Sequence, residues 1–357
     1  MIGRTLSLYL ARRFTRWILG IFLIGATLVF VVDFFELLRR IGDDESFNIG
    51  QAVLLSLMRT PSLTERILPF ATLFGSMAAF VGLTRRSELV VIRAVGVSIW
   101  QFIAPPIAVT LLIGVLATTV YNPVSSWLKD RADLLSVELF GREQMIMQQT
   151  TQQVWVRQRS QDTESVLHAR QVRDKGNTIV GVTLFVFSLT GDFVERLEAA
   201  RGELGDGVWK LTNVTVSVPD VAPTHLATLD FPTRIKAEEI LDQIAQPDAV
   251  SFWQLGGLID RAERAGVAAY PYRLQLQTLL SLPVFLASMV LIAATVSLRV
   301  SRFGGTGRLV ASGVAAGFVL YVTTEIARDL GSVGIIAPTI AAWAPGIVAA
   351  LLGVTIL

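Results

Sequence analysis

The sequence contains no cysteine and only two histidines among its 357 residues. Disulfide bonds, thiolate chemistry and cysteine metal ligands are therefore excluded, whichever compartment the chain faces. His168 and His225 both lie outside the long apolar runs, so we do not expect a metal centre or a catalytic triad built on histidine. We predict neither a catalytic site nor a metal site.

Lysine is also scarce, and no lysine lies in a phosphate-binding loop. The four lysines of the chain are Lys129, Lys175, Lys210 and Lys236. None of them completes the pattern Gly-x-x-x-x-Gly-Lys-Ser/Thr, in which backbone amides and the lysine hold the phosphates of ATP. We therefore expect no bound cofactor, and any uphill transport must take its energy from a partner protein or an ion gradient.

Charged residues make up only 17% of the sequence, whereas hydrophobic residues make up 52%. Crossing about 30 Å of lipid hydrocarbon takes roughly 20 helical residues. Four uncharged runs are that long, and two more become so when polar residues at one end are included. The six runs are 17–32, 67–84, 94–128, 274–298, 309–324 and 330–357. We predict an α-helical membrane protein with six transmembrane helices, three on each side of a long insertion.

Positive charge is unevenly distributed over the segments that flank these runs. Three segments are rich in arginine: the N-terminus, the connection between the second and third runs, and the connection between the fourth and fifth. Because short cytoplasmic loops carry excess Lys and Arg, we expect these segments in the cytoplasm. The insertion 129–271 then lies on the outer side, the periplasm in a cell with two membranes. No small-residue cleavage site follows the basic start, so we interpret the first run as a retained anchor.

The insertion changes from a helical to a strand pattern near Gln144. Apolar residues alternate in several short stretches, separated by the turn signals RDKGN, LTGD and LGDG. Such spacing predicts an antiparallel β domain, either a sandwich or a partly open, jelly-roll-like roll. After Pro232 the pattern becomes helical again, with Ser251 as a predicted N-cap and Gly266 as a predicted helix end. The apolar face of that helix comprises Leu255, Leu258, Ile259 and Ala262.

The predicted organisation has four parts. Residues 1–128 form transmembrane helices 1–3, with a short cytoplasmic helix at about 86–96 between helices 2 and 3. Residues 129–235 form the periplasmic β domain, and a periplasmic helical connection follows at 236–271. Residues 272–357 return to the membrane as helices 4–6.

Ionisable residues lie near the predicted outer ends of the spans. Those of the first two spans are Asp33, Glu36, Glu65 and Arg66, the last two opening the second span. Such groups either pair within the lipid headgroup zone or serve a function, and the sequence leaves both interpretations open. Arg39 and Arg40 are different, because two adjacent arginines at the outer interface oppose the inward bias of positive charge. Guanidinium binds phosphate through two parallel hydrogen bonds, so we predict a phosphate contact there.

The connection TRRSELVVIRAVGV at 84–97 is charged, although a plain turn would join the second and third runs. Ser87 is a predicted N-cap, Glu88 suits the positive helix start, and Gly96 can end the helix after about two turns. The predicted apolar face of this helix comprises Leu89, Ile92 and Val95. Such a helix either lies on the lipid surface or inserts into a groove of a partner protein, and the pattern favours neither.

Four phrases along the chain together resemble a known family. They are VDFFELLRRIG, RRSELVVIRAVGVS, GVWKLTNVTV and AAWAPGI. They are similar to the LptF/LptG family of lipopolysaccharide-export permeases, and SELVV and FFELLRR are more similar to its LptG branch than to its LptF branch. The resemblance covers nearly the whole chain. It implies three spans, a periplasmic jelly-roll-like β domain and three further spans, located in the bacterial inner membrane.

The resemblance also implies partners and a mechanism. With an LptF-like paralogous permease, this chain would enclose a cavity that takes lipopolysaccharide from the outer leaflet of the inner membrane. A dimer of an LptB-like ATPase would bind and hydrolyse the ATP, so the chain itself is a non-catalytic permease subunit. Lipopolysaccharide would then pass to the β domain and on to LptC-like and LptA-like periplasmic proteins. No nucleic acid is implied.

Two sets of residues receive roles from the resemblance. The helix between spans 2 and 3 matches the coupling helix of the family, which sits in a groove of the ATPase. The implied coupling residues are Arg85, Arg86, Glu88, Leu89, Ile92, Arg93, Val95 and Gly96. The implied contacts to lipopolysaccharide phosphates are Arg39, Arg40, Lys129 and Arg131. Asp33 departs from relatives that carry a basic residue near this position.

Three other functions compete with this one. The main alternative is a membrane-anchored periplasmic scaffold or receptor without ATPase coupling, which predicts that Glu88→Arg is tolerated. A lipoprotein-releasing type of permease usually has four spans, which disagrees with a three-plus-three arrangement. An intramembrane enzyme is disfavoured, since no predicted span centre holds a Ser–Lys, His or Asp pair.

Overall fold

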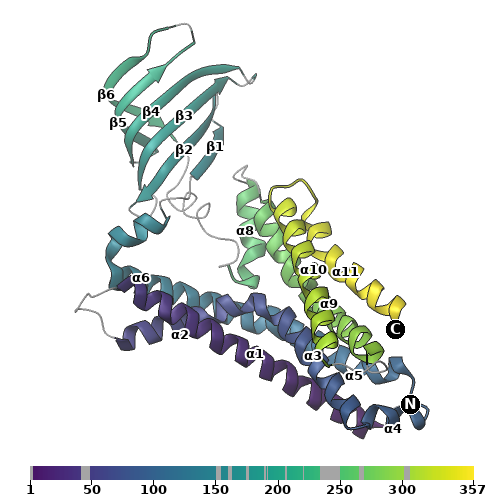
Figure 1. Cartoon of the computed structure of the whole chain (residues 1–357). Helices are drawn as coiled ribbons and strands as arrows, with labels where there is room; N and C mark the ends of the chain where they lie inside the picture. Colours follow the sequence, from purple (N-terminus) through teal and green to yellow (C-terminus); the bar gives the residue numbers. More distant parts are fainter. Residues whose placement is uncertain are drawn as a thin grey trace. The chain divides into compact units, whose positions relative to one another are not determined.

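The chain divides into two units in its computed structural model (Figure 1). The structure describes residues 3–357 except 42–48, 150–153, 160–162, 174–176, 189, 191, 206, 220, 234–249, 265–268 and 301–305. The membrane unit comprises Met1–Asp133, Ala249–Gly256 and Tyr270–Leu357. The sheet unit comprises Leu134–Asp248 and Gly257–Ala269.

The membrane unit consists of helices. Its elements are α1 (Arg4–Ile41), α2 (Ile49–Thr64), the 3₁₀ turn η1 (Glu65–Ile67), α3 (Leu68–Arg85), α4 (Glu88–Ala94), α5 (Ile99–Leu116), the π-helical turn η2 (Ala117–Tyr121), α6 (Asn122–Gln149), α9 (Tyr270–Val300), α10 (Thr306–Ser332) and α11 (Pro338–Ile356). Helix α6 continues past Asp133 into the sheet unit.

Five helical segments within the described residues are long and apolar enough to cross a membrane. They are Arg4–Arg39, Ile49–Arg85, Ile99–Ser136, Tyr270–Ser297 and Pro338–Ile356. The remaining predicted run, 309–324, is helical within α10 but is not one of the five, so six spans are not confirmed.

The second span differs from its prediction. We expected it to begin at Glu65, but the helical segment begins at Ile49 and includes η1 in its middle. The polar stretch RTPSLTER conceals this continuity in the sequence, and Pro61 lies inside α2. Glu65 and Arg66 therefore lie within a candidate span and not at its start.

The core of the membrane unit is formed mainly by α1, α3, α5 and α9. Phe14 of α1 and Phe80 of α3 are fully buried, and their ring centroids are 4.9 Å apart in an edge-to-face arrangement. Gly114 of α5 lies so close to α9 that a Cβ there would be 2.4 Å from the Cα of Pro283. Close backbone approach at small residues is typical of helix packing in membranes.

The surface of α1 is apolar where a helix in water would be polar. Leu23, Ile24 and Leu28 are 63%, 71% and 64% exposed. A contiguous exposed apolar stripe is typical of a helix that faces lipid or another membrane protein. The surface thus agrees with a multi-pass membrane protein.

The sheet unit contains one six-stranded antiparallel sheet (Figure 1). Its strands are β1 (Val154–Arg159), β2 (Thr163–Arg173), β3 (Thr178–Ser188), β4 (Phe193–Leu204), β5 (Val208–Ser217) and β6 (Thr224–Pro232), paired in sequence order. The predicted antiparallel β structure is therefore confirmed. A jelly roll is not, because the described strands follow one another without the crossovers of a Greek key.

The sheet buries the face that alternation predicts. Trp209 and Leu211 of β5 are fully buried, whereas Lys210 between them is exposed. Their partners in the core cluster include Leu167, Ile179, Leu184 and Leu197. The predicted start of the strand pattern near Gln144 is wrong, since α6 continues to Gln149.

Helix α8 (Phe252–Arg264) follows the sheet. Its first amide bonds go to the Ser251 carbonyl, which accepts from Gln254 N at 2.9 Å and from Leu255 N at 3.2 Å. The predicted start of this helix is therefore confirmed. Its predicted apolar residues Leu255, Leu258 and Ile259 are buried, whereas Ala262 is half-buried. The predicted end at Gly266 lies outside the described residues.

Candidate functional site

The short helix α4 joins α3 to α5. Ser87 occupies its N-cap position, but Ser87 has φ of 58° and its side chain makes no capping hydrogen bond. The predicted side-chain cap is therefore wrong, because the chain enters α4 from a turn in which Ser87 N–H donates to the Thr84 carbonyl at 3.0 Å. At the other end Gly96 has φ of 84°, and its N–H donates to the Arg93 carbonyl. Glycine adopts this left-handed conformation without strain, which explains why the helix ends there.

The apolar residues of α4 are divided between the core and the surface. Leu89 is buried, and Ile92 packs partly buried against the same core cluster. The exposed ones are Val90, Val91 and Val95, at 65%, 61% and 78%. The predicted single face of Leu89, Ile92 and Val95 is therefore wrong for Val95, because the helix ends at Ala94 and its periodicity stops there.

Three exposed arginines accompany these valines. We define the α4 surface as the exposed residues Arg85, Arg86, Val90, Val91, Arg93 and Val95. Apolar side chains bordered by charged ones are typical of a protein-docking surface. Val90 and Val91 were not predicted from the sequence as part of this surface. The signal in the sequence was that the two valines follow Leu89 directly. Neighbouring helix residues point about 100° apart, so when Leu89 faces the core these two residues turn away from it.

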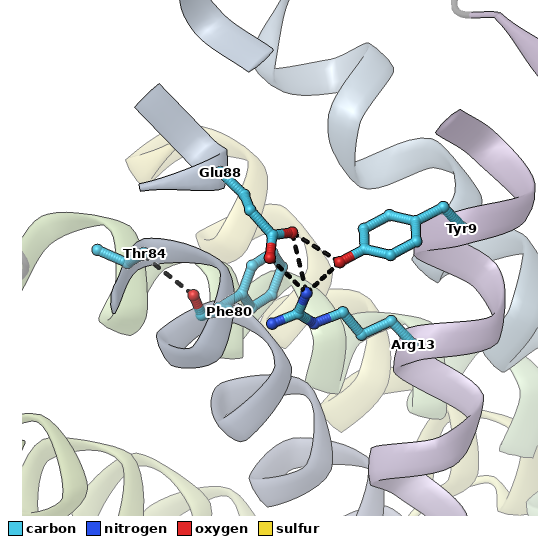
Figure 2. A network of polar contacts seen from close by, with 5 residues as sticks. All are labelled: Tyr9, Arg13, Phe80, Thr84 and Glu88. Atoms are coloured by element: carbon cyan, nitrogen blue, oxygen red, sulfur yellow. Dashed lines mark hydrogen bonds and ion pairs between the residues drawn. The ribbon is translucent and has the colours of Figure 1, made fainter. Parts of the chain in front are cut away.

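Glu88 at the start of α4 is bound to two side chains of α1 (Figure 2). Arg13 Nη1 donates to Glu88 Oε1 at 3.0 Å and to Oε2 at 2.9 Å. The Tyr9 hydroxyl donates to Oε2 at 2.7 Å and accepts a hydrogen bond from Arg13 Nη1. The side chain of Arg13 is only 11% exposed, and that of Glu88 is 27% exposed. The predicted coupling residue is thus fixed to the first helix of the chain.

The network keeps Glu88 ionised. Partial burial alone would raise the pKa of Glu88, which is the largest single influence. Hydrogen bonds from Tyr9 and Arg13, with the positive charges of Arg13 and Arg86, outweigh it and hold the pKa below the ordinary value of 4.5. At neutral pH the site therefore presents a carboxylate.

The residues predicted to bind phosphate lie on two helices. Arg39 is exposed near the end of α1, whereas the side chain of Arg40 lies outside the described residues. Lys129 and Arg131 lie on α6, where Lys129 is half-buried and Arg131 is exposed with its guanidinium 5.5 Å from the ring centre of Trp127. Among the side chains that the structure describes, no hydrogen bond, ion pair or ring contact joins Arg39 to Lys129 or Arg131.

Asp33 has partners on α2 that were not predicted from the sequence. The Ser56 hydroxyl donates to Asp33 Oδ2 at 2.8 Å, and Arg59 Nη1 lies 3.8 Å from Oδ1. Both partners are on α2, in a segment that was not predicted to be helical. Asp33 therefore takes part in helix–helix contact between α1 and α2.

A second carboxylate, Glu65, lies within the candidate span Ile49–Arg85. Asn122 Nδ2 is 3.2 Å from both of its oxygens, and the Ser125 hydroxyl donates to Oε1. Asn122 is 1% exposed, and its Oδ1 accepts from Phe252 N at 2.8 Å. This network joins η1, α6 and the first residue of α8.

The described residues contain no group of three or more His, Asp or Glu side chains arranged to hold a metal ion. The polar networks above are hydrogen bonds and ion pairs that join helical segments of the membrane unit.

Comparison with known proteins gives consistent matches over nearly the whole chain. The family model described as "Lipopolysaccharide export system permease LptF/LptG" matches residues 8–357. The chain is similar to the lipopolysaccharide export system permease protein LptG of Escherichia coli strain K12, with 23% identity over 355 residues, 96% of this chain and 93% of the relative. It is also similar to the LptG protein of Haemophilus influenzae, with 21% identity over 309 residues, 83% of this chain and 82% of the relative.

Proposed function

The chain belongs to the LptF/LptG family of lipopolysaccharide export system permeases, and from this premise we propose that it is one of two permease halves in an ATP-driven exporter. The pair takes lipopolysaccharide from the outer leaflet of the bacterial inner membrane. The chain itself is non-catalytic and holds no cofactor, and a separate ATPase dimer supplies the energy. The sheet unit receives the lipid and passes it to periplasmic partner proteins.

The observation that carries the proposal is the combination of the α4 surface with the anchored Glu88. The exposed valines and arginines of the α4 surface offer a patch for a partner, in the connection between two candidate spans. Leu89 and Ile92 pack α4 onto the core of the same unit. A movement that a bound partner imposes on the α4 surface is therefore transmitted to the membrane helices, as a coupling element requires.

This division of α4 refines the roles of its residues. Leu89 and Ile92, which face inward, attach α4 to the membrane unit. Val90, Val91 and Val95 contact the ATPase together with Arg85, Arg86 and Arg93. Gly96 sets the end of the helix, and Glu88 lies between the two groups with part of its side chain accessible.

The lipid itself requires a protected path. Each CH₂ group of an acyl chain costs about 0.8 kcal/mol to transfer into water. A molecule with several acyl chains cannot leave the bilayer at a useful rate without an apolar route and an energy source. We propose that Arg39, Arg40, Lys129 and Arg131 bind its phosphates at the start of that route, because guanidinium and ammonium groups pair well with phosphate.

The proposal is tested by purifying the tagged chain in mild detergent and identifying retained proteins and lipids by mass spectrometry. We expect an ATPase with a phosphate-binding loop, a second permease half and lipopolysaccharide. The Glu88→Arg variant should retain little bound ATPase or should lose ATP-dependent export. An arginine at position 88 is repelled by Arg13 and cannot accept the hydrogen bonds that the carboxylate accepts.

The matched control is Glu203→Arg, a charge reversal at an exposed residue of β4. It should retain the ATPase and export. Recovery of the chain without any ATPase, together with full function of Glu88→Arg, would overturn the proposal and favour a membrane-anchored scaffold or receptor.

A further inference from the structure

We infer that Arg13 and Tyr9 are positioning residues that fasten α4 to α1 through Glu88, so that movement of α4 is passed directly to the first membrane helix. The inference rests on the proposed function, since it assigns a route for the movement that the ATPase imposes on α4. It concerns a contact within this chain, between residues 75 and 79 positions apart in sequence.

The two α1 residues are arranged to hold one carboxylate. Tyr9 and Arg13 are four residues apart, so they lie on the same side of α1. The guanidinium of Arg13 lies 5.7 Å from the centre of the Tyr9 ring. This cation–π contact restrains the guanidinium while its Nη1 bonds both oxygens of Glu88. Charged donors and acceptors form stronger hydrogen bonds than neutral ones, which favours this contact over a plain surface pair.

The neighbouring helix leaves space for the guanidinium. At Gly82 of α3, an added Cβ would be 3.1 Å from Arg13 Nη2, closer than an ordinary contact. Arg13 thus lies against the end of α3 while it bonds the start of α4. An added side chain at position 82 would require the guanidinium to shift by a few tenths of an ångström.

The α1 side of this contact is packed against α3. The α1 residues Leu10, Phe14 and Ile18 are fully buried, and Phe14 packs on Phe80 of α3 one turn before Thr84. Figure 2 shows Phe80 and Thr84 on α3 beside the network, with the Thr84 hydroxyl bonded to the Phe80 carbonyl at 3.0 Å. Because Arg13 precedes Phe14 directly, its backbone cannot move without moving the buried face of α1.

The other basic residues of the N-terminal segment differ from Arg13. Arg12 and Arg16 are exposed, whereas Arg13 is only 11% exposed at its side chain. A general attraction of this segment to anionic lipid would depend on the exposed arginines. Of these arginines, Arg13 is the one that bonds Glu88 and fastens α4 to α1, and this difference makes Arg12 a matched control.

The first test measures the fastening itself and is independent of export. The chain has no native cysteine, so Leu8→Cys on α1 and Val91→Cys on α4 place two spin labels on exposed sites of the full chain in nanodiscs. We expect a narrow distribution of label distances in the parent and in Arg12→Gln, and a clearly broader one in Arg13→Gln. An equally narrow distribution in Arg13→Gln would overturn the inference.

The second test measures coupling in the reconstituted complex with its ATPase, as lipopolysaccharide released per ATP hydrolysed. Loss of charged hydrogen bonds changes an equilibrium by about tenfold or more, so we expect a fall of about that size in Arg13→Gln with the ATPase still bound. Tyr9→Phe, which keeps the ring and loses the hydroxyl, should fall less, and Arg13→Lys should recover part of the loss.

The two tests distinguish failure of the proposed function from failure of the Arg13 contact. If the parent complex shows no ATP-dependent release, the proposed function fails, while the label distances still decide whether Arg13 fastens α4. If the parent releases lipid and Arg13→Gln does so with the same yield per ATP, the inference fails and the proposed function stands. An unfolding temperature equal to that of the parent, measured for each variant, excludes a general loss of folding as the cause.

Discussion

Glu88 and Glu65 are two carboxylates of the same unit that are held in different ways. Glu88 begins a short helix with 27% of its side chain exposed, and its donors are a guanidinium and a phenol. Glu65 lies within a candidate span, where a buried amide and a hydroxyl donate to it. The first contact keeps a charge accessible beside the exposed α4 surface, whereas the second joins helix segments to one another.

The difference indicates which property each network controls. A buried polar group that loses its partner costs more than an exposed one, because no water replaces the bond. Changes around Glu65 should therefore reduce the stability of the membrane unit. Changes around Glu88 should mainly reduce the transfer of movement from α4.

The largest effect on stability is expected from Asn122→Ala. This change removes two contacts to Glu65 and the acceptor for Phe252 N–H at once. Unsatisfied buried groups cost about 1–3 kcal/mol each, so we expect unfolding in a denaturing-detergent titration to become easier by about 3 kcal/mol. Gln51→Ala, at an exposed residue of α2, serves as the control. A stability equal to that of the control would show that the Glu65 network does not join these segments.

A smaller and more local effect is expected at Ser87, which precedes Glu88 in the left-handed conformation. A β-branched residue fits this conformation poorly, at a cost of roughly 1–2 kcal/mol, whereas glycine fits it without strain. Ser87→Val should therefore speed hydrogen exchange of the α4 amides, and Ser87→Gly should leave it equal or slower. Equal exchange in both variants would contradict the left-handed turn.

The smallest effect is the pH dependence of the Glu88 network. The pKa of Glu88 is lowered in the folded chain, so its contribution to stability is fully present above the ordinary value of 4.5 and is lost as the pH falls through the folded pKa. The carboxyl ¹³C resonance that disappears in Glu88→Gln should titrate below 4.5, and its midpoint should rise in Arg13→Gln. A midpoint that is the same in both proteins would remove Arg13 as the stabilising charge.

Several features could be predicted from the sequence because they depend on local pattern. Apolar runs of sufficient length located most of the candidate spans, and alternation predicted the antiparallel strands. The short helix between two spans was expected from Glu88 and Gly96, which stand at its ends in the structure. The resemblance in four phrases agrees with the family match over residues 8–357.

Other features could not be predicted because they depend on partners distant in sequence. Nothing near Arg13 in the sequence distinguishes it from Arg12, yet only Arg13 reaches Glu88. The helix α2 was missed because Pro61 and polar neighbours interrupt the apolar pattern that marks a span. Asn122 likewise carries no signal of its contact with Glu65.

Hydropathy, periodicity and motif order are properties of consecutive residues. The class of the protein, most of its candidate spans, its antiparallel strands and its family could therefore be predicted from them. Which face of α4 is exposed, and which charged groups meet, depends on how the helices pack. Helix packing brings residues such as Arg13 and Glu88 within hydrogen-bonding distance across 75 positions of the chain, and no local pattern encodes that approach.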